Sequence, residues 1–298
     1  MKVVLTLIKR NIKLFFNDKG MFLTSLITPL ILLLLYATFL GNVYRDSFIQ
    51  NFPKEIIISE SVINGLVGGQ LTSSILAVSC VTVAFCSNFL MVQDKALGNI
   101  KDITISPIKS TKLSLSYYIA SLISTLIICF VAAVACLIYV SSIGWYMSFI
   151  DVVLLFVDVI LLVFFGTALS SVINYFLSSQ GQISAVGTVV SSCYGFICGA
   201  YMPISSFGDG LQKVISFLPG TYGTSLLREH AMRGAIGELS NQGMPEEHIK
   251  AIKDAMDSNV YFFGTSVTEV SKFLILIITI LLLLGIYIFM NKFRKINK

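Results

Sequence analysis

Charged residues are scarce in this sequence. Asp, Glu, Lys and Arg make up 12% of its 298 residues, while 55% are hydrophobic. A soluble globular protein carries about twice that fraction of charged residues. The composition therefore excludes an ordinary soluble domain and indicates a membrane protein.

Residues and motifs that catalysis would need are also few. Neither His230 nor His248 has a second nitrogen or sulfur ligand at metal-binding spacing, so we expect no metal site. An intramembrane serine enzyme would need a base beside its nucleophile, and we place His230 in an external loop. The dipeptide Gly-Lys does not occur, which excludes a phosphate-binding loop and therefore an ATPase site in this chain.

Cysteine is missing from the predicted external loops. All six cysteines lie within long apolar runs, so we expect buried, reduced thiols rather than a disulfide framework. They are Cys80, Cys86, Cys129, Cys136, Cys193 and Cys198.

Six apolar runs are long enough to cross a bilayer, which takes about 20 residues. They are Met21 to Leu40, Val62 to Gln93, Leu113 to Val140, Ile150 to Leu177, Ile183 to Met202 and Phe273 to Met290. The sequence thus predicts an all-α integral membrane protein with six transmembrane helices. An even number of spans places both termini on the same side.

The basic residues near the spans collect on one side. They lie before the first span, between the second and third spans, and after the last: Lys2, Lys9, Arg10, Lys13, Lys19, Lys95, Lys101, Lys109, Lys112, Lys292, Arg294, Lys295 and Lys298. Positively charged loops stay in the cytoplasm, so we expect both termini there. The net charge of +5 follows from this topology, and we expect no nucleic-acid partner.

The first 20 residues are a separate element. Apolar residues recur at helical spacing with lysines on other faces, which predicts an amphipathic interfacial helix on an anionic membrane. A disordered basic tail is the alternative. We therefore divide the chain into a cytoplasmic interfacial helix, residues 1–20, and a membrane domain, residues 21–298.

Leu66 to Gln70 reads Leu-Val-Gly-Gly-Gln, one residue away from the LSGGQ signature of ATP-binding cassette ATPases. Without a phosphate-binding loop this match has no functional partner, and we interpret it as chance. Gly65 and Gly69 instead form a small-xxx-small pair, which lets two membrane helices approach closely.

Three segments share motifs with a known family. They are LITPLILLLLYATFLG in the first span, VQDKALGNIKDITISPIKSTKLSLSYYIAS between the second and third spans, and CGAYMPISSFGDGLQKVISFLPGTYGTSLLREHAMRG after the fifth. Together they resemble the ABC-2 type permeases, which are membrane subunits of bacterial ATP-binding cassette exporters. The resemblance covers essentially the whole chain.

This resemblance implies a six-span half-transporter in a bacterial plasma membrane. It would work with a second permease copy or paralogue, with the surrounding membrane lipid, and with separate ATPase subunits that bind ATP and Mg. The resemblance also implies that the loop 94–112 docks the ATPase as a coupling helix. Region 203–268 would contain short re-entrant helices and an external cap.

Carried over onto this sequence, the coupling segment consists of Asp94, Lys95, Gly98, Asn99, Ile100, Ile103 and Pro107. The family often has Glu where Asp94 stands and Thr where Asn99 stands. A short helix with Ile100 and Ile103 on one side can insert an apolar face into a cleft of the ATPase, and Pro107 ends it. The alternative is an ordinary solvated loop whose lysines bind lipid headgroups.

The fifth span carries small residues at every fourth position, Gly187, Ser191, Gly195 and Gly199. This repeat predicts a close helix contact, either within the chain or across a permease dimer.

Two short helices and a cap are expected before the last span. Phe207 to Phe217 and Leu218 to Arg228 are too short to cross the membrane. In Glu229 to Thr268 we expect a helix that begins after Pro245. This cap would gate substrate exit, bind a partner, or have no specific role.

The fourth span contains two carboxylates. Asp151 and Asp158 are seven residues apart and nearly on one helical face, with Asp158 about 10 Å deeper. Membrane carboxylates usually face a bundle interior or a wet cavity. Asp158 either lines the translocation path, where it would meet a cationic group of the substrate, or is protonated or bonded to neighbouring hydroxyls.

We therefore expect the membrane subunit of an ATP-driven exporter that forms a path for an amphipathic substrate, such as an antibiotic, a peptide, a lipid or a lipid-linked glycan. An ion-gradient-driven secondary transporter is the alternative. It should show inverted repeats or paired broken helices, and we find no convincing repeat.

Overall fold

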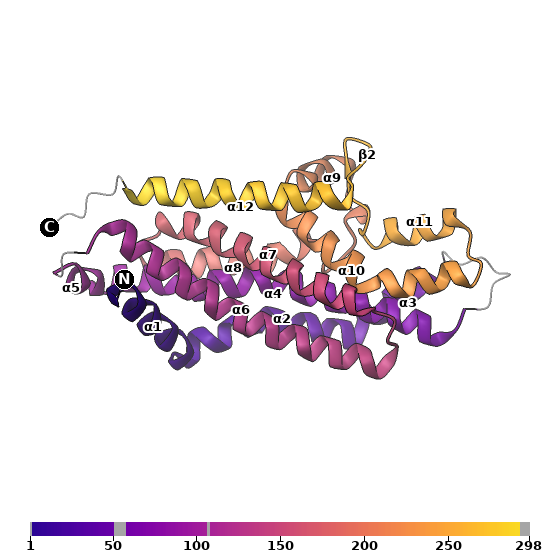
Figure 1. The fold of residues 1–298 in the computed structure, drawn as a ribbon, viewed down its shortest axis with the longest axis horizontal. Coiled ribbons are helices and arrows are strands. Elements are labelled where there is room, and N and C mark those ends of the chain that lie inside the picture. The colour runs from indigo at the N-terminus through magenta and orange to yellow at the C-terminus, as the bar shows by residue number, and fades with distance from the viewer. Residues whose placement is uncertain (1, 51–57, 106–107, 293–298) are drawn as a thin grey trace.

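The computed structural model describes residues 2–50, 58–105 and 108–292, which form an elongated bundle of helices (Figure 1). Five helical stretches among them are long and apolar enough to cross a membrane. They are Lys19–Gln50, Glu60–Ala96 (α4), Ser110–Ile143 (α6), Phe149–Tyr175 (α7) and Glu269–Lys292 (α12). The prediction of a helical membrane protein is confirmed.

The first and fifth predicted spans differ from the other four, each of which is a single long apolar helix. The first consists of α2 (Lys19–Leu35), a π-helical turn (Tyr36–Leu40) and α3 (Gly41–Gln50). The fifth corresponds to α8 (Gln180–Ile197), which has 18 residues and is not among the five long apolar helices. The prediction of six spans is therefore not confirmed.

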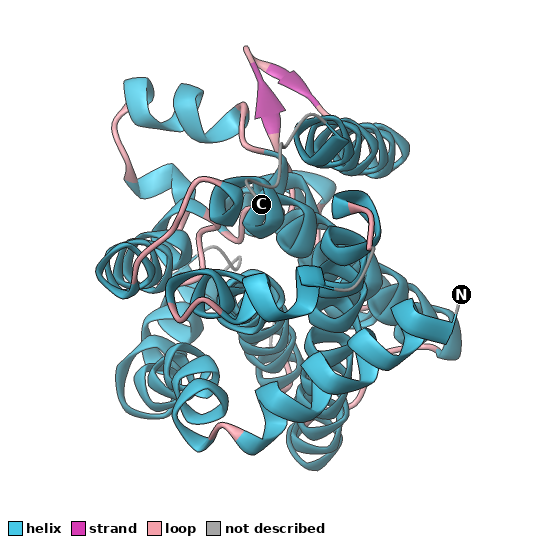
Figure 2. Ribbon diagram, turned by 90° about the vertical axis from the view of Figure 1, so that its left-hand side faces the viewer, coloured by secondary structure: helices cyan, strands magenta, loops and turns pink. Residues whose placement is uncertain are grey.

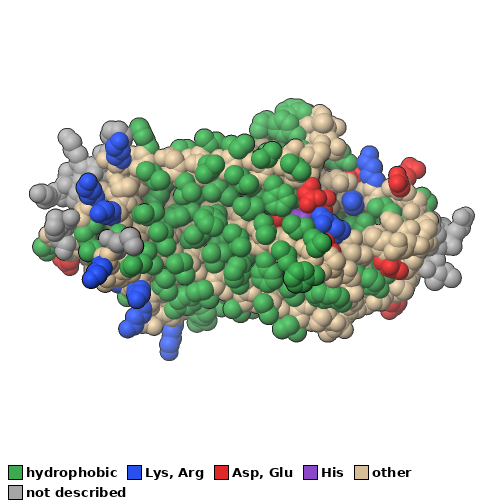
Figure 3. Space-filling view, viewed as in Figure 1, with side chains coloured by type: hydrophobic (Ala, Val, Ile, Leu, Met, Phe, Trp, Pro, Cys, Tyr) green, Lys and Arg blue, Asp and Glu red, His purple; other side chains and the backbone are tan. Residues whose placement is uncertain are grey.

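Basic side chains gather at one end of the bundle. That end holds α1 (Lys2–Asn17), α5 (Asn99–Ile105) and the end of α12. Figure 3 shows Lys and Arg side chains there, beside an apolar middle section. The opposite end holds α3 and α11 (Glu246–Ala255). We call the two ends the basic end and the cap end.

α4 is the central helix, packed against α2, α6, α7, α8 and α10 (Pro219–Asn241). Its most apolar 18-residue window is entirely buried. Several of its hydroxyls bond to its own backbone; for example, Ser79 donates to the Ile75 carbonyl at 2.6 Å, and Thr82 donates to the Val78 carbonyl at 2.9 Å. Such bonds allow hydroxyl side chains to be buried without a partner on another helix.

Side-chain hydrogen bonds fasten α4 to its neighbours. Ser87 Oγ lies 2.5 Å from Ser121 Oγ on α6, and Asn88 Nδ2 donates to Ser171 Oγ on α7 at 2.7 Å. Polar contacts of this kind stabilise helix association in membranes. The centre of the bundle is therefore held by polar contacts as well as by apolar packing.

Gly65 and Gly69 allow close approach to α4. A Cβ at Gly69 would lie 2.8 Å from the carbonyl oxygen of Ala231 on α10, and one at Gly65 would lie 3.2 Å from the carbonyl oxygen of Gly144. The glycines within and beside the LSGGQ-like segment thus serve packing, as predicted.

The region between α8 and α12 contains helices of different lengths and a hairpin. They are a 3-10 turn (Ile204–Ser206), α9 (Asp209–Ser216), α10, α11, and a hairpin of β1 (Tyr261–Phe262) and β2 (Thr265–Ser266) that projects from the bundle in Figure 2. α11 begins directly after Pro245, as the sequence predicts.

The predicted second short helix is wrong in its length. The sequence predicts an end at Arg228, but α10 continues to Asn241 and packs against α4, α7 and α12. The continuation buries Ala231, Met232 and Ala235. These apolar residues keep the helix inside the bundle beyond the expected boundary.

Candidate functional site

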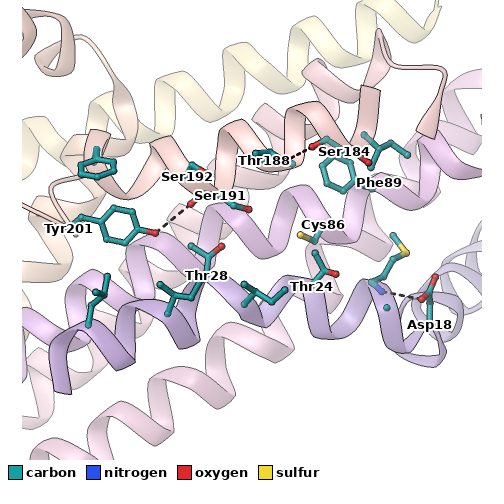
Figure 4. Close-up of a pocket in the computed structure, with 18 of the residues that line it drawn as sticks. Asp18, Thr24, Thr28, Cys86, Phe89, Ser184, Thr188, Ser191, Ser192 and Tyr201 are labelled. Carbon is teal, nitrogen blue, oxygen red and sulfur yellow. Dashed lines mark hydrogen bonds between the residues drawn. The ribbon is translucent and has the colours of Figure 1, made fainter. Parts of the chain in front are cut away.

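A groove runs between α2 and α8, with α4 as its third wall (Figure 4). Its volume is about 1020 Å³. The lining includes Thr24, Thr28 and Ile31 from α2, Cys86 and Phe89 from α4, and Ser184, Thr188, Ser191 and Ser192 from α8.

The lining mixes hydroxyl groups with apolar side chains. Asp18 is the one charged residue among the described residues that line the groove, and it caps α2 by accepting from Met21 N at 3.1 Å. Tyr201 lies at the opposite end, where its hydroxyl donates to the Ser191 carbonyl at 3.4 Å. This lining suits an amphipathic molecule better than a small ion.

Three of the four small residues predicted to form one helix contact lie on α8. Gly187 and Ser191 line the groove, and Gly195 packs beneath the ring of Tyr201. Gly199 lies beyond the end of α8 and has a φ of +70°, which glycine adopts readily. Gly199 falls outside the predicted stripe because α8 ends at Ile197. A close contact through the other three residues, within the chain or across a permease dimer, stays a prediction.

Asp94 is the centre of a cluster at the basic end. Its carboxylate accepts hydrogen bonds from Arg10 at 2.7 and 3.2 Å, from Asn99 at 2.9 Å and from Tyr117 at 2.6 Å. We call these four residues the basic-end cluster. The hydrogen bond to Asp94 raises the pKa of Arg10 above its ordinary value. Helices α1, α4, α5 and α6 therefore meet at a single carboxylate.

Lys95 and Gly98 shape the turn from α4 into α5. Lys95 Nζ donates to the carbonyl oxygens of Asn174, Tyr175 and Leu177 at 3.0, 2.9 and 3.1 Å. These carbonyls lie at the end of α7, where helical partners run out. Gly98 has a φ of +80°, which permits the sharp turn.

The apolar face of α5 packs against the helices of this chain. Ile100 and Ile103 are half-buried, and they pack against the cluster Leu7, Leu90, Met91, Leu113 and Tyr117. The prediction that both isoleucines form a plug directed into the ATPase stays a prediction, since each is only half-buried in this chain. They hold α5 on the permease.

Other residues of this loop face solvent. Lys101 and Asp102 are exposed, and so are Leu97 and Ile105, at 68% and 85%. Any partner that docks at α5 would meet these four side chains. Pro107, the predicted stop, lies outside the described residues.

Five ionisable side chains form a cluster between α7, α10 and α12. Asp158 Oδ2 lies 2.5 Å from His230 Nδ1, and Glu269 Oε1 lies 2.9 Å from His230 Nε2. Arg233 is 3.1 Å from Glu269 and 3.4 Å from Asp151. We call these five residues the histidine cluster. It connects the fully buried Asp158 to the partly exposed Glu269 and Arg233.

His230 therefore lies inside the bundle, and its predicted place in an external loop is wrong. Burial alone lowers the pKa of His230, but the hydrogen bond with Asp158 and the negative charge of Asp158 raise it above the ordinary value of 6.5. The partner of Asp158 is a histidine rather than the predicted hydroxyls. Asp158 is not among the groove residues, and its role in a translocation path stays a prediction.

A second buried ion pair connects the cap to the bundle. Arg228 Nη1 lies 3.4 Å from Asp257, and Arg228 Nη2 donates to the carbonyls of Gly199 at 2.6 Å and Cys198 at 3.2 Å. Asp257 also accepts from the backbone nitrogen of Ile204 at 2.9 Å. These contacts join α10, the turn after α8 and the residues that follow α11.

Comparison with known families identifies the chain. A family model described as ABC-2 type transporter matches residues 2–231, from α1 to the middle of α10. A search of curated proteins gives no match. The match spans most of the chain and agrees with its long apolar helices. The chain therefore belongs to the ABC-2 type transporter family, as a multi-pass membrane permease subunit that works with ATPase subunits and lacks an ATPase site itself.

Proposed function

We propose that this chain is the permease subunit of an ATP-driven exporter in a bacterial plasma membrane. The groove between α2 and α8 forms half of its translocation path. The groove reaches the protein surface, since Thr24 and Thr188 are exposed. A closed path needs a facing wall, which a second permease copy or paralogue supplies.

The lining of the groove is the observation that carries this proposal. Hydroxyls from α2 and α8 bind the polar part of a substrate, while Ile31 and Phe89 contact its apolar part. The substrate class is amphipathic: an antibiotic, a peptide, a lipid or a lipid-linked glycan.

In this proposal α8 is the fifth of six spans. The small and hydroxyl residues that make α8 less apolar than the other spans include Ser184, Gly187, Thr188 and Ser191, all of which line the groove. They avoid the lipid, so a modest hydropathy is compatible with a membrane position. Six spans place both termini, with the basic end, in the cytoplasm.

The ATPase docks on α5 in this proposal. Its movement on ATP binding is transmitted through Asn99 and Asp94 to α4, and from there to the wall of the groove. The residues that touch the ATPase are the exposed ones, Lys101, Asp102 and Ile105.

One substitution tests the groove. In vesicles that contain the permease and its ATPase, Thr188→Trp fills the groove and should abolish ATP-dependent transport of an amphipathic fluorescent probe. Val189→Trp is the matched control, because Val189 is 60% exposed but does not line the groove. Equal transport by the two variants would refute the groove assignment. Transport driven by an ion gradient without ATP would refute the exporter.

A further inference from the structure

Three phenylalanines form a compact group at the side of the bundle. The ring centroids of Phe217 and Phe262 are 5.2 Å apart, those of Phe217 and Phe263 are 5.8 Å apart, and those of Phe262 and Phe263 are 4.9 Å apart. Phe217 directly follows α9, and the other two belong to the β1–β2 hairpin. We call these three residues the aromatic knob.

The hairpin holds the knob in place without another molecule. Tyr261 pairs with Ser266, and Phe262 pairs with Thr265. The two turn residues, Phe263 and Gly264, have φ angles of +48° and +83°, as a tight two-residue hairpin turn requires. The edge-to-face contacts among the three rings add to this order.

The knob is nevertheless open to its surroundings. Phe217, Phe262 and Phe263 are 60%, 38% and 64% exposed, and Leu211 and Val214 of the neighbouring α9 are 47% and 58% exposed. An exposed apolar patch of this kind indicates a surface that is covered by membrane lipid or by another protein.

The position of the knob identifies what covers it. The hairpin leads directly into α12, whose outer face exposes Val270, Leu274, Ile278 and Leu281. Only 17% of the most apolar window of α12 is buried by protein, so this face borders lipid in a membrane permease. Figure 3 shows hydrophobic side chains over α9 that continue the apolar section of the surface.

Charged groups mark the edge of the lipid-facing surface at the same level. Glu269 begins α12, and its carboxylate contacts Arg233 at 3.1 Å. Aromatic side chains are favoured at this boundary between hydrocarbon and headgroups. A cleft of about 380 Å³ beside the knob combines Thr268 and Ser271 hydroxyls with the apolar surfaces of Phe262 and Ile275, a combination that matches the ester and acyl regions of a phospholipid.

We propose that the aromatic knob inserts into the headgroup boundary of the bilayer at the cap end, and that phospholipid occupies the cleft beside it. The knob thereby fixes the depth of the hairpin and of the start of α12. The hairpin lies beyond the residues matched by the family model, and the insertion does not depend on the proposed transport path.

Fluorescence of a single tryptophan tests the insertion. The chain has one tryptophan, Trp145, so Trp145→Phe gives a background without tryptophan. Three reporters are added separately: Phe263→Trp in the knob, Leu281→Trp on the lipid face of α12, and Glu246→Trp at the exposed start of α11. Each is reconstituted into phosphatidylcholine vesicles with and without bromine near the headgroup end of the acyl chains.

The proposal predicts that brominated lipid quenches the Phe263→Trp reporter several-fold more than the Glu246→Trp reporter. Iodide added to the water should quench the Phe263→Trp reporter weakly and the Glu246→Trp reporter strongly. Strong iodide quenching of the Phe263→Trp reporter without bromine quenching would overturn the proposal, since the knob would then lie in water. Protection from both quenchers would overturn it too, because a protein would then cover the knob. Leu281→Trp verifies that brominated lipid reaches the protein.

Discussion

The basic-end cluster and the histidine cluster both join helices through charge, but they differ in burial. In the first, the Arg10 side chain is 31% exposed and reaches the buried Asp94 from a helix on the outside of the bundle. In the second, the side chains of Asp158 and His230 are both 0% exposed. The first cluster attaches α1 and α5 to the outside of the bundle, whereas the Asp158–His230 pair at the centre of the second belongs to the interior.

This difference in burial changes how much each ion pair affects the stability of the fold when one partner is removed. Removing one partner from a buried pair leaves an uncompensated charge, which is strongly destabilising. Removing the Asp94 charge from the basic-end pair leaves Arg10, which is partly exposed and can be solvated by water. We therefore expect disruption of the histidine cluster to affect the whole fold, and disruption of the basic-end cluster to affect α1 and α5 locally.

The largest effect is expected from His230→Ala. It leaves the Asp158 carboxylate buried without its partner, which should reduce the free energy of unfolding by about 3–5 kcal/mol. The unfolding midpoint in detergent measures this. Asp158→Asn combined with His230→Ala removes the charge as well and should recover part of the loss. An unchanged midpoint for the single variant would show that Asp158 is not charged beside His230.

A smaller and more local effect is expected from Asp94→Asn. It weakens the charge-assisted bond from Arg10, at a cost of about 1.5–3 kcal/mol. Hydrogen exchange should become faster in α1 and α5, while α7 and α12 keep their protection. Arg10→Gln should give the same pattern, and the double variant should add little to either. If Asp94→Asn made hydrogen exchange faster throughout the bundle, the basic-end cluster would not act locally, and the proposed difference between the two clusters would be wrong.

The pH dependence separates the clusters further. The folded-state pKa of His230 is raised above 6.5, so its contribution to stability is fully present below that pH and is lost as pH rises through the raised pKa. The unfolding midpoint should therefore fall as pH rises above 6.5 and through the raised pKa of His230. His230→Gln should flatten this fall. Arg10 does not titrate in this range, so the attachment of α1 should not change.

The smallest effect on folding is expected from Lys101→Glu combined with Ile105→Asp. Both side chains face solvent, so the unfolding midpoint should stay within the small range typical of surface changes, about 0.5 kcal/mol. Copurification of the ATPase should nevertheless fall. Ile100→Asp is the contrasting variant, since it should detach α5 from the bundle. Unchanged copurification with Lys101→Glu and Ile105→Asp would place the docking surface elsewhere.

Sequence periodicity predicted the long helices well, because apolar runs of span length leave few other structures possible in a membrane. The start of α11 was also predictable, since Pro245 and the acidic residues after it are typical of a helix N-terminus. Helical spacing likewise placed Ile100 and Ile103 on one face. It could not tell whether that face meets the chain itself or a partner.

The histidine cluster could not be predicted from local sequence. Glu229, His230 and Arg233 make the second half of α10 appear solvent-exposed. Their partners Asp158 and Glu269 lie 72 and 39 residues from His230, so only tertiary structure reveals that they are paired. A hint was the deep position of Asp158, which indicated a translocation path or a carboxyl group that is protonated or bonded to hydroxyls, but not a histidine partner.

The order in which the residues of the histidine cluster occur along the chain has a consequence for insertion into the membrane. His230 is synthesised before Glu269, which begins the last long helix. While the chain is being inserted into the membrane, α10 therefore lacks one of the carboxylates that its histidine and Arg233 contact in the finished bundle. We expect α10 to take its final place only after α12 has been inserted. Chains truncated before Glu269 should then expose α10 to proteolysis although all earlier spans are in the membrane.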